Sequence, residues 1–342
     1  MRTSEHPPAR DRGPEGAGHG GDAGAGFDVI TMGRVGVDIY PEQVGVSLDR
    51  VRSFGKFLGG SPTNVAVATA RYGWRSAVVT RTGHDPFGTF IHQALRDYGV
   101  DDRFVSAVSG LNTPVTFCEI FPPDNFPLYF YREPKAPDLE IRPEELDHDA
   151  IRAAGILWVT VTGLCQEPSR TATLEALRSR GRNGITVIDL DYRPMFWESR
   201  EEARAWVAEA LPHVTVAVGN LDEWETAVGQ GGPDASAVAD AAKELGIELA
   251  VVKQGPEGVL AVDGTAAVRV PPVPVDVVNG LGAGDAFGGA LCHGLLSGWP
   301  SERIMRFANA AGAIVASRLA CSDAMPVFQE VEAKLGETGH AD

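Results

Sequence analysis

Basic residues are scarce in this chain. Its 30 Lys and Arg residues face 46 Asp and Glu residues, which gives a formal net charge of −16 over 342 residues. A chain this acidic repels polyphosphate backbones and anionic lipid surfaces, so we expect neither a nucleic-acid partner nor a membrane partner. A small anionic substrate is still compatible with this charge, because a few local arginines can override the overall field.

Cysteine and long apolar runs are also in short supply. Four cysteines are scattered along the chain without a CxxC pair, at Cys118, Cys165, Cys292 and Cys321. This spacing argues against a disulfide framework and a zinc site, and it favours reduced thiols and a cytoplasmic location. No apolar run is long enough to span a bilayer, and we find no signal-peptide core.

Two nucleotide-binding signatures are missing. No segment matches GxxxxGK[ST], so any phosphate chemistry must be built without a P-loop. Residues 16–21 match GxGxxG formally, but neither a strand before them nor a helix after them is expected. The segment after the first predicted strand, residues 33–36, lacks the dinucleotide spacing, which argues against an oxidoreductase of that type.

An alternation of apolar runs and helical segments begins at Phe27. Such alternation predicts an α/β fold with a mostly parallel central sheet covered by helices on both faces, and ligands in such folds bind at the carboxyl ends of the strands. At 342 residues and 44% hydrophobic content, the chain can build one large domain. Strands are expected at 27–32, 76–81, 156–162, 186–190, 214–218 and 249–253, and helices at 62–72, 86–98, 170–180, 201–210, 235–245, 285–297 and 301–319.

Two regions break this alternation, at about 34–58 and 111–132. Both carry strand-like patterns without helices, and the second contains the turn-rich stretch 122–125. We interpret them as a small β-sheet lid over the strand ends, although a pair of ordinary surface hairpins would show the same pattern. Residues 1–26 hold almost no large apolar side chain and are expected to form a disordered tail. The domain is expected to span 27–332, with a second tail at 333–342.

The most informative segment is Asn279–Phe287, NGLGAGDAF. It places three glycines and one carboxylate, Asp285, in a turn that opens an apolar helical run. Amide groups crowded at a helix N-terminus form an anion hole. A carboxylate beside an anion hole can accept a proton from an alcohol that attacks the anion, as in a kinase. A tight loop followed by an ordinary first-turn acid would explain the segment without a ligand.

Four other segments place polar residues after predicted strands. The paired glycines before Asn64 allow close approach of a ligand, although a loop and helix cap would explain them equally well. Asp38 can bond sugar hydroxyls, or it can be a loop acid without a role. Asn220 and Glu223 stand three apart and can orient waters on a nucleotide-bound magnesium ion, or form a capping box, or both. The glycine turn after Lys253 can form the base of a nucleotide site, or it can close a hairpin.

Two arginines complete the candidate set. Arg132 lies in the expected lid and Arg193 follows a predicted strand. Arginine binds carboxylates through two parallel hydrogen bonds, so two arginines converging near a substrate would suggest an acid substrate.

With these segments in this order, the chain resembles the ribokinase/PfkB carbohydrate kinases from about Phe27 to Gln329. The patterns GGSPTNVAVATARYG and GLGAGDAF are specific as a pair. The resemblance implies a ribokinase-like three-layer αβα fold with a small β-sheet lid, and ATP and Mg²⁺ as cofactors. It implies these roles: Asp285 as catalytic base; Gly282, Ala283 and Gly284 as anion hole; Asn220 and Glu223 for Mg–ATP; Lys253, Gly255, Gly258 and Asn309 for the nucleotide; and Asp38, Gly60 and Asn64 for the sugar.

Three further segments narrow the resemblance. DxDYRPxxW at 189–197, YRE at 131–133 and SDAMP at 322–326 resemble the branch that phosphorylates 5-dehydro-2-deoxy-D-gluconate in myo-inositol breakdown. This resemblance implies transfer to the C6 hydroxyl, with Arg132 and Arg193 contacting the sugar acid and Arg132 the better candidate for its carboxylate. A kinase for 2-keto-3-deoxygluconate or fructose, or a non-catalytic sugar sensor, is the alternative.

Two expectations remain. Many family members carry Asp-Thr where this chain has Asn279-Gly280, and that acid helps hold a monovalent cation, so the difference argues against potassium activation. A lid sheet with exposed edges often pairs with a second copy, so we expect a homodimer through the lid.

Overall fold

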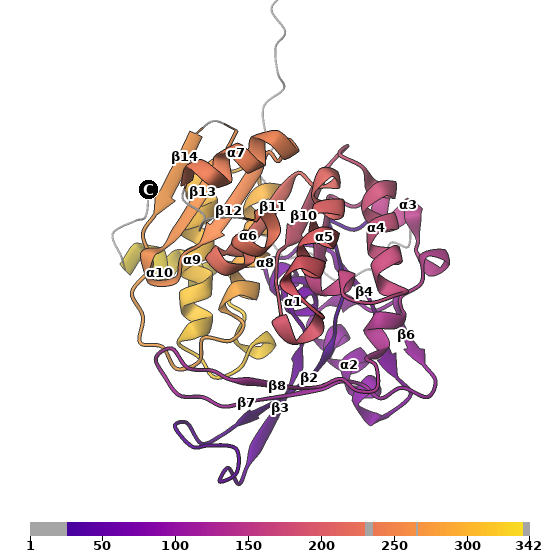
Figure 1. The fold of residues 1–342 in the computed structure, drawn as a ribbon. Coiled ribbons are helices and arrows are strands. Elements are labelled where there is room, and N and C mark those ends of the chain that lie inside the picture. The colour runs from indigo at the N-terminus through magenta and orange to yellow at the C-terminus, as the bar shows by residue number, and fades with distance from the viewer. Residues whose placement is uncertain (1–25, 230–234, 265, 338–342) are drawn as a thin grey trace, which may run out of the picture.

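A central sheet organises the computed structural model, which describes residues 26–229, 235–264 and 266–337 (Figure 1). The strand order is β14-β13-β12-β11-β10-β9-β1-β4-β5, and β6 also pairs with β4. Strands β9 to β12, β1 and β4 run parallel, whereas β13 and β14 form an antiparallel hairpin at one edge. The bounds are β1 Val29–Met32, β4 Ser76–Gly83, β5 Val100–Asp101, β6 Val105–Val108, β9 Ile156–Thr160, β10 Ile185–Asp189, β11 Val216–Asn220, β12 Leu249–Lys253, β13 Val259–Asp263 and β14 Ala266–Val270.

Helices cover both faces of this sheet. Consecutive side chains of a strand point to opposite faces, so Val29 packs into one buried cluster and Ile30 into another. The Val29 cluster contains residues of α1, α2, α8, α9 and α10, and the Ile30 cluster contains residues of α3 to α7. The bounds are α1 Ser61–Arg71, α2 Pro86–Asp97, α3 His148–Ala153, α4 Ser169–Arg180, α5 Arg200–Ala210, α6 Leu221–Val228, α7 Ala235–Leu245, α8 Ala283–Leu296, α9 Ser301–Ala316 and α10 Phe328–Glu337.

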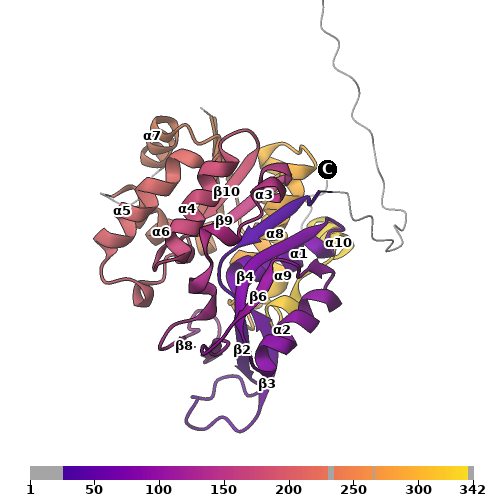
Figure 2. The same cartoon turned by 90° about the vertical axis from the view of Figure 1, so that its right-hand side faces the viewer.

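A second, small sheet has the order β3-β2-β7-β8. It comprises β2 Gly36–Pro41, β3 Phe54–Gly59, β7 Val115–Cys118 and β8 Leu128–Tyr131. Figures 1 and 2 place it on one side of the central sheet, below the main body in both views. Its inner face has its own buried cluster, which joins Tyr40, Cys118 and Ile120 to Cys321.

The three-layer fold and its mostly parallel sheet are therefore confirmed, and both regions that break the alternation contribute strands to the small sheet. Four features were not predicted: edge strands β5 and β6, the strands β13 and β14, the short helix α3, and helix α10. Helix α10 extends to Glu337, beyond the predicted boundary at 332, because Val331 and Leu335 are buried against the core. The predicted tail at 1–26 lies, except for Gly26, outside the described residues. In the described part of the chain, every helix is too short or too polar to cross a bilayer.

Candidate active site

A cavity of about 440 Å³ lies between the small sheet and the carboxyl ends of the central strands. The small sheet contributes Asp38 and Phe130, and the strand ends contribute Asp189, Asn220 and Lys253. This is the edge at which parallel α/β sheets bind their ligands. Eleven of the fifteen candidate residues line this cavity: Asp38, Gly60, Asn64, Arg193, Asn220, Glu223, Lys253, Gly255, Gly282, Gly284 and Asp285.

Asp285 lies in the first turn of α8 and points at the start of α1. Asn64 donates a 2.7 Å hydrogen bond from Nδ2 to Oδ2 of Asp285. The orientation of the Asn64 side-chain amide is fixed at its other end, because the Ser322 hydroxyl donates to Oδ1 of Asn64 over 2.6 Å. Burial raises the pKa of Asp285 above its ordinary value, and the bond from Asn64 opposes that shift. The result is a desolvated carboxylate held in one orientation.

The glycine loop turns sharply before α8. Gly282 has φ 81°, a left-handed conformation that other residues rarely adopt, and α8 begins at Ala283. The first amides of the helix have no helical partner, so the loop offers donors to an anion. The loop is closely packed: a Cβ at Gly280 would lie 2.9 Å from the Phe126 ring, and one at Gly282 would lie 2.7 Å from Sγ of Cys321. Larger residues at these two glycines would not fit.

Asn279 holds the start of this loop. Its side chain donates from Nδ2 to the Leu319 carbonyl over 2.7 Å and accepts the Leu281 amide on Oδ1 over 3.1 Å. Both ends of this buried amide therefore have partners within the protein.

Asp38 lies on β2 at the opposite wall. The Tyr40 hydroxyl donates to its Oδ2 over 3.0 Å, and Tyr40 also contacts Sγ of Cys321 at 2.7 Å. Burial raises the pKa of Asp38 to about 6, against the lowering effect of the Tyr40 bond and of Arg34. A buried carboxylate with a free oxygen suits the recognition of hydroxyl groups.

Arg34 and Arg193 share one carboxylate. Arg34 donates to Oδ2 of Asp191 over 3.1 Å, and Arg193 contacts Oδ1 of the same residue at 2.7 Å. Burial works against ionisation of Asp191, but Arg193 and Arg34 hold its pKa below the ordinary value. The two guanidinium groups thus flank a carboxylate that stays charged, and both face the cavity.

Asn220 and Glu223 form a reciprocal cap at the start of α6. Asn220 Oδ1 accepts the Glu223 amide over 2.9 Å, and Glu223 Oε2 accepts the Asn220 amide over 2.7 Å. The capping interpretation of this pair is therefore correct. The second oxygen of Glu223, Oε1, lies 3.7 Å from Nη1 of Arg193 on the cavity side. Capping thus leaves one carboxylate oxygen for a ligand.

Lys253 ends β12 beside Asp189, with 4.0 Å between Nζ and Oδ1. Burial raises the pKa of Asp189, and Lys253 opposes that effect while Asp191 and Glu223 reinforce it. A Cβ at Gly284 would lie 3.4 Å from the Lys253 ammonium, so this cation stands directly beside the glycine loop. Lys253 and the loop amides together bring a cation and hydrogen-bond donors to one wall of the cavity.

Gly258 and Asn309 both contact the segment around Pro271. Gly258 has φ +85°, and a Cβ there would lie 3.0 Å from Pro271. Asn309, on α9, donates from Nδ2 to the Pro271 carbonyl over 2.9 Å. These two residues therefore fix one segment next to Gly255, which lines the cavity itself.

Arg132 lies in a different cavity, of about 560 Å³, with Lys135, Cys165 and Phe196. Its guanidinium is paired with the buried Asp138 at 2.6 Å. The structure does not bring Arg132 into the cavity that holds Asp285. No contact in the structure therefore supports the predicted bond from Arg132 to the substrate carboxylate, which stays a prediction.

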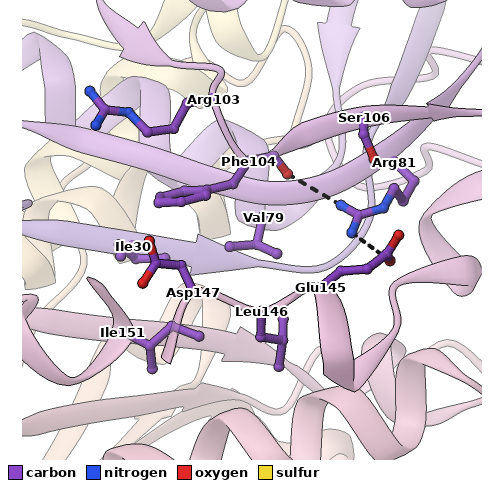
Figure 3. Close-up of a pocket in the computed structure, with 10 residues that line it drawn as sticks. All are labelled: Ile30, Val79, Arg81, Arg103, Phe104, Ser106, Glu145, Leu146, Asp147 and Ile151. Atoms are coloured by element: carbon purple, nitrogen blue, oxygen red, sulfur yellow. Dashed lines mark hydrogen bonds and ion pairs between the residues drawn. The ribbon is translucent and has the colours of Figure 1, made fainter. Parts of the chain in front are cut away.

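A third cavity lies against β1, β4 and β6 (Figure 3). Arg81 dominates it, and its two terminal nitrogens donate to Glu145 over 2.8 Å and to the carbonyls of Thr80 and Phe104. These bonds join β4 to η2 (Pro143–Glu145) and to the residue before β6. Arg81 therefore stabilises the edge of the sheet.

Sequence reasoning missed Arg34, Tyr40, Asp189, Asp191 and Ser322 as site residues. Asp189 and Asp191 stand at the end of a predicted buried strand, where a charged residue is unusual, so a signal was present. Arg34 likewise follows the first strand directly. Tyr40 and Ser322 act through tertiary contacts that span up to 281 positions. The SDAMP segment contains Ser322, but its pattern does not show that Ser322 contacts Asn64.

The fold and the cavity define an α/β protein of the ribokinase-like class. The chain belongs to the pfkB family of carbohydrate kinases, whose family model matches residues 27–327. It is 34% identical over 319 residues to 5-dehydro-2-deoxygluconokinase of Shouchella clausii, covering 92% of this chain and 97% of that relative. The enzyme of the same name from Geobacillus thermodenitrificans is 33% identical, with 90% and 92% covered.

Solved structures of sugar kinases share the fold. Fructokinase of Xylella fastidiosa with bound ATP superposes with a TM-score of 0.79 at 26% identity, covering 92% of this chain and 99% of that one. A double mutant of the Vibrio cholerae O395 fructokinase, with fructose, ADP and potassium bound, gives 0.79 at 25% identity, with 91% and 99% covered. The chain is a sugar kinase.

Proposed function

We propose that the protein transfers the γ-phosphoryl group of ATP to the C6 hydroxyl of 5-dehydro-2-deoxy-D-gluconate, a step of myo-inositol breakdown. The observation that carries the proposal is the half-buried Asp285 carboxylate, oriented by Asn64 in the first turn of α8 beside the glycine loop. The names of the relatives from Shouchella clausii and Geobacillus thermodenitrificans support the choice of sugar acid.

Asp285 acts as the general base in this proposal. Its raised pKa brings the carboxylate closer to the pKa range in which proton transfer at neutral pH is efficient. It takes the proton of the attacking hydroxyl, while the amides of Gly282, Ala283 and Gly284 stabilise charge on the transferring group. Catalysis then consists chiefly of positioning and electrostatic stabilisation. Closure of the small sheet as a lid excludes water that would compete as acceptor.

The nucleotide half of the cavity fits ATP with Mg²⁺. Glu223 keeps one carboxylate oxygen on the cavity side and Asn220 stands beside it, and together they suit water ligands of a hard cation. Mg²⁺ bound there would neutralise charge on the phosphates. Lys253 and Gly255 face the phosphates, and Gly258 and Asn309 hold the adenine side. Because Asn279 is a neutral amide with internal partners, we expect no activation by potassium.

The sugar half of the cavity fits an acidic acceptor. Asp38, Gly60 and Asn64 bind the hydroxyl groups, and Arg193 supplies positive charge at its rim. The test is an ADP-release panel with 5-dehydro-2-deoxy-D-gluconate, 2-keto-3-deoxygluconate and D-fructose, followed by ¹³C and ³¹P NMR of the product. We expect the first acid to have the highest kcat/KM and the product to carry phosphate on C6. A higher kcat/KM for D-fructose, or sugar binding without ADP release, would overturn the proposal.

We also propose that two copies associate through the outer faces of their small sheets. Phe54, Tyr129 and Tyr131 are 38%, 43% and 66% exposed on these strands. Phe117 links Phe54 to Tyr131 through ring contacts of 5.8 and 5.5 Å, which makes a continuous aromatic row. Strands β3 and β8 are edges of this sheet, and pairing with a second copy would cover them.

A further inference from the structure

Arg34 lies at the centre of the cavity, although none of the sequence motifs includes it among the site residues. It follows β1, the strand between β9 and β4, so it projects from the middle of the sheet's carboxyl edge. Its side chain is only 12% exposed and lines the same cavity as Asp285 and Asp38. Both of these carboxylates act electrostatically on Arg34, which places the guanidinium in the sugar half of the site.

The internal pairing of Arg34 is incomplete. Asp191 accepts from Nη2 of Arg34 on one oxygen, while its other oxygen belongs to Arg193. Arg193 has a second carboxylate nearby, because Oε1 of Glu223 lies 3.7 Å from its Nη1, whereas the only ion pair of Arg34 among the described residues is with the shared Asp191. In addition, Nε of Arg34 is buried and has no hydrogen-bond partner among the residues that the structure describes. A guanidinium with unused donors beside a cavity is suited to an anionic ligand.

The position of Arg34 is rigid. Thr63 donates its hydroxyl hydrogen to the Arg34 carbonyl over 3.2 Å, and Gly60 packs so closely that a Cβ there would lie 2.5 Å from that oxygen. The guanidinium carbon stands 5.9 Å from the centre of the Phe130 ring on β8. Little side-chain freedom is left to lose on binding, which favours affinity.

Arg132 is shielded from this cavity. The rings of Phe130 and Phe196 pack at 5.1 Å between centroids. Phe130 lines the cavity of Asp285 and Phe196 lines the cavity of Arg132, so this aromatic pair separates the two spaces. Arg132 lies 5.2 Å from the centre of the far ring, Phe196, and is already paired with Asp138.

We propose that Arg34, and not Arg132, binds the carboxylate of the acceptor and thereby selects sugar acids over neutral sugars. The inference rests on the proposed function, because it concerns the acceptor whose hydroxyl approaches Asp285. Arg34 presents a planar fork that matches a carboxylate, and Asp191 keeps this fork oriented from behind. The guanidinium donors of Arg34 that Asp191 does not use then pair with the acceptor carboxylate.

The test compares two acceptors that differ by one negative charge and one methyl group, 5-dehydro-2-deoxy-D-gluconate and its methyl ester. The wild type should prefer the acid. Arg34→Gln should lower kcat/KM for the acid by roughly tenfold to a hundredfold, mainly through KM, because one charged hydrogen-bonded pair is lost. The methyl ester should be used as well as before. Arg34→Lys should recover part of the preference, since it restores the charge but not the fork.

Two controls keep the outcomes distinct. Arg103→Gln removes a surface arginine paired with Asp101 and should leave the ratio of the two acceptors unchanged. Arg34→Gln should still fold, because Asp191 keeps its ion pair with Arg193. A thermal melt of the variant checks this expectation. Equal losses for both acceptors, a wild type indifferent to the ester, or loss of the acid preference in Arg132→Gln would each overturn the inference. If instead the wild type favours D-fructose in the panel, the proposed function itself fails.

Discussion

Asp285 meets two opposing requirements with one carboxylate. A base needs a pKa raised toward neutrality, which burial provides, and it must still lose its proton before the reaction, which the bond from Asn64 favours. Ser322 connects this pair to the C-terminal part of the chain by fixing the Asn64 amide. A neutral hydrogen-bonding replacement at 285 would keep the shape and remove only the basicity.

We therefore predict that Asp285→Asn lowers kcat by at least roughly 10²-fold, the usual range for loss of a positioned base. Nucleotide affinity should change little, since the glycine loop and Lys253 are untouched. Single-turnover kinetics and titration with an ATP analogue measure the two quantities. Near-normal turnover in this variant would contradict the role of Asp285.

Asp38, which we propose binds the sugar, lowers the stability of the folded protein at neutral pH. An unfolded Asp ionises near pH 3.8, whereas burial raises the pKa of Asp38 to about 6 in the folded protein. Between these values the folded state binds the extra proton, so stability falls as pH rises through this window and stays lower above it. A shift of this size corresponds to about 3 kcal/mol.

Asp38→Asn should therefore raise Tm at pH 8 by roughly 2–5 °C, and the gain should shrink toward pH 5, where the wild-type group is protonated. The same change should lower kcat/KM for the acceptor. Calorimetry across this pH range measures the first effect. Asp49→Asn, at a side chain that is 74% exposed, is the control and should leave Tm unchanged. A gain that is equal at both pH values would contradict the burial argument.

At the scale of elements, the junction of β3 and α1 sets the distance between the two sheets. Gly60 has φ 103° and lies against the backbone of Arg34 and Val35, so the end of the small sheet touches the end of β1 without a side chain between them. This contact brings Asp38 and Asn64 to the same cavity.

Gly60→Ala should lower the free energy of unfolding by about 2–4 kcal/mol, because strain and a backbone clash combine. It should also raise KM for the acceptor. Gly73→Ala is the matched control: Gly73 has φ +86° but no atom lies within 4 Å of its added Cβ. That change should cost about 1–2 kcal/mol and leave KM alone. Urea unfolding and steady-state kinetics distinguish them, and equal effects at both glycines would contradict the close-contact argument.

The elements differ in how well they can be predicted. Central strands such as β9 and β12 are continuous apolar runs, because they are buried on both faces, and these were predicted correctly. Strand β5 has two residues, and β14 is largely exposed, so neither leaves a pattern. Arg34 was missed although it closely follows the first predicted strand, because an arginine in the glycine-containing segment 33–36 resembles an ordinary loop residue. Its role depends on Asp191, 157 positions away.

At the scale of the whole molecule, the proposed dimer makes a direct prediction. Light scattering after size exclusion should give twice the chain mass at micromolar concentration. Tyr131→Asp should shift it toward the monomer, because it places a charge in the aromatic row. Leu221→Asp is the control, since Leu221 is also an exposed apolar side chain, at 38%, but lies on α6. A monomeric wild type would contradict the association.

One contact described above links the two halves of the reaction. Phe126, in the connection between β7 and β8, packs against Gly280, and the buried cluster of the small sheet includes Leu281 and Cys321. Under the proposed mechanism, the surface that covers the acceptor is thus also a supporting wall of the loop that would receive the phosphate. A displaced sheet would leave that loop poorly braced, so we expect idle hydrolysis of ATP to be disfavoured until an acceptor has arrived.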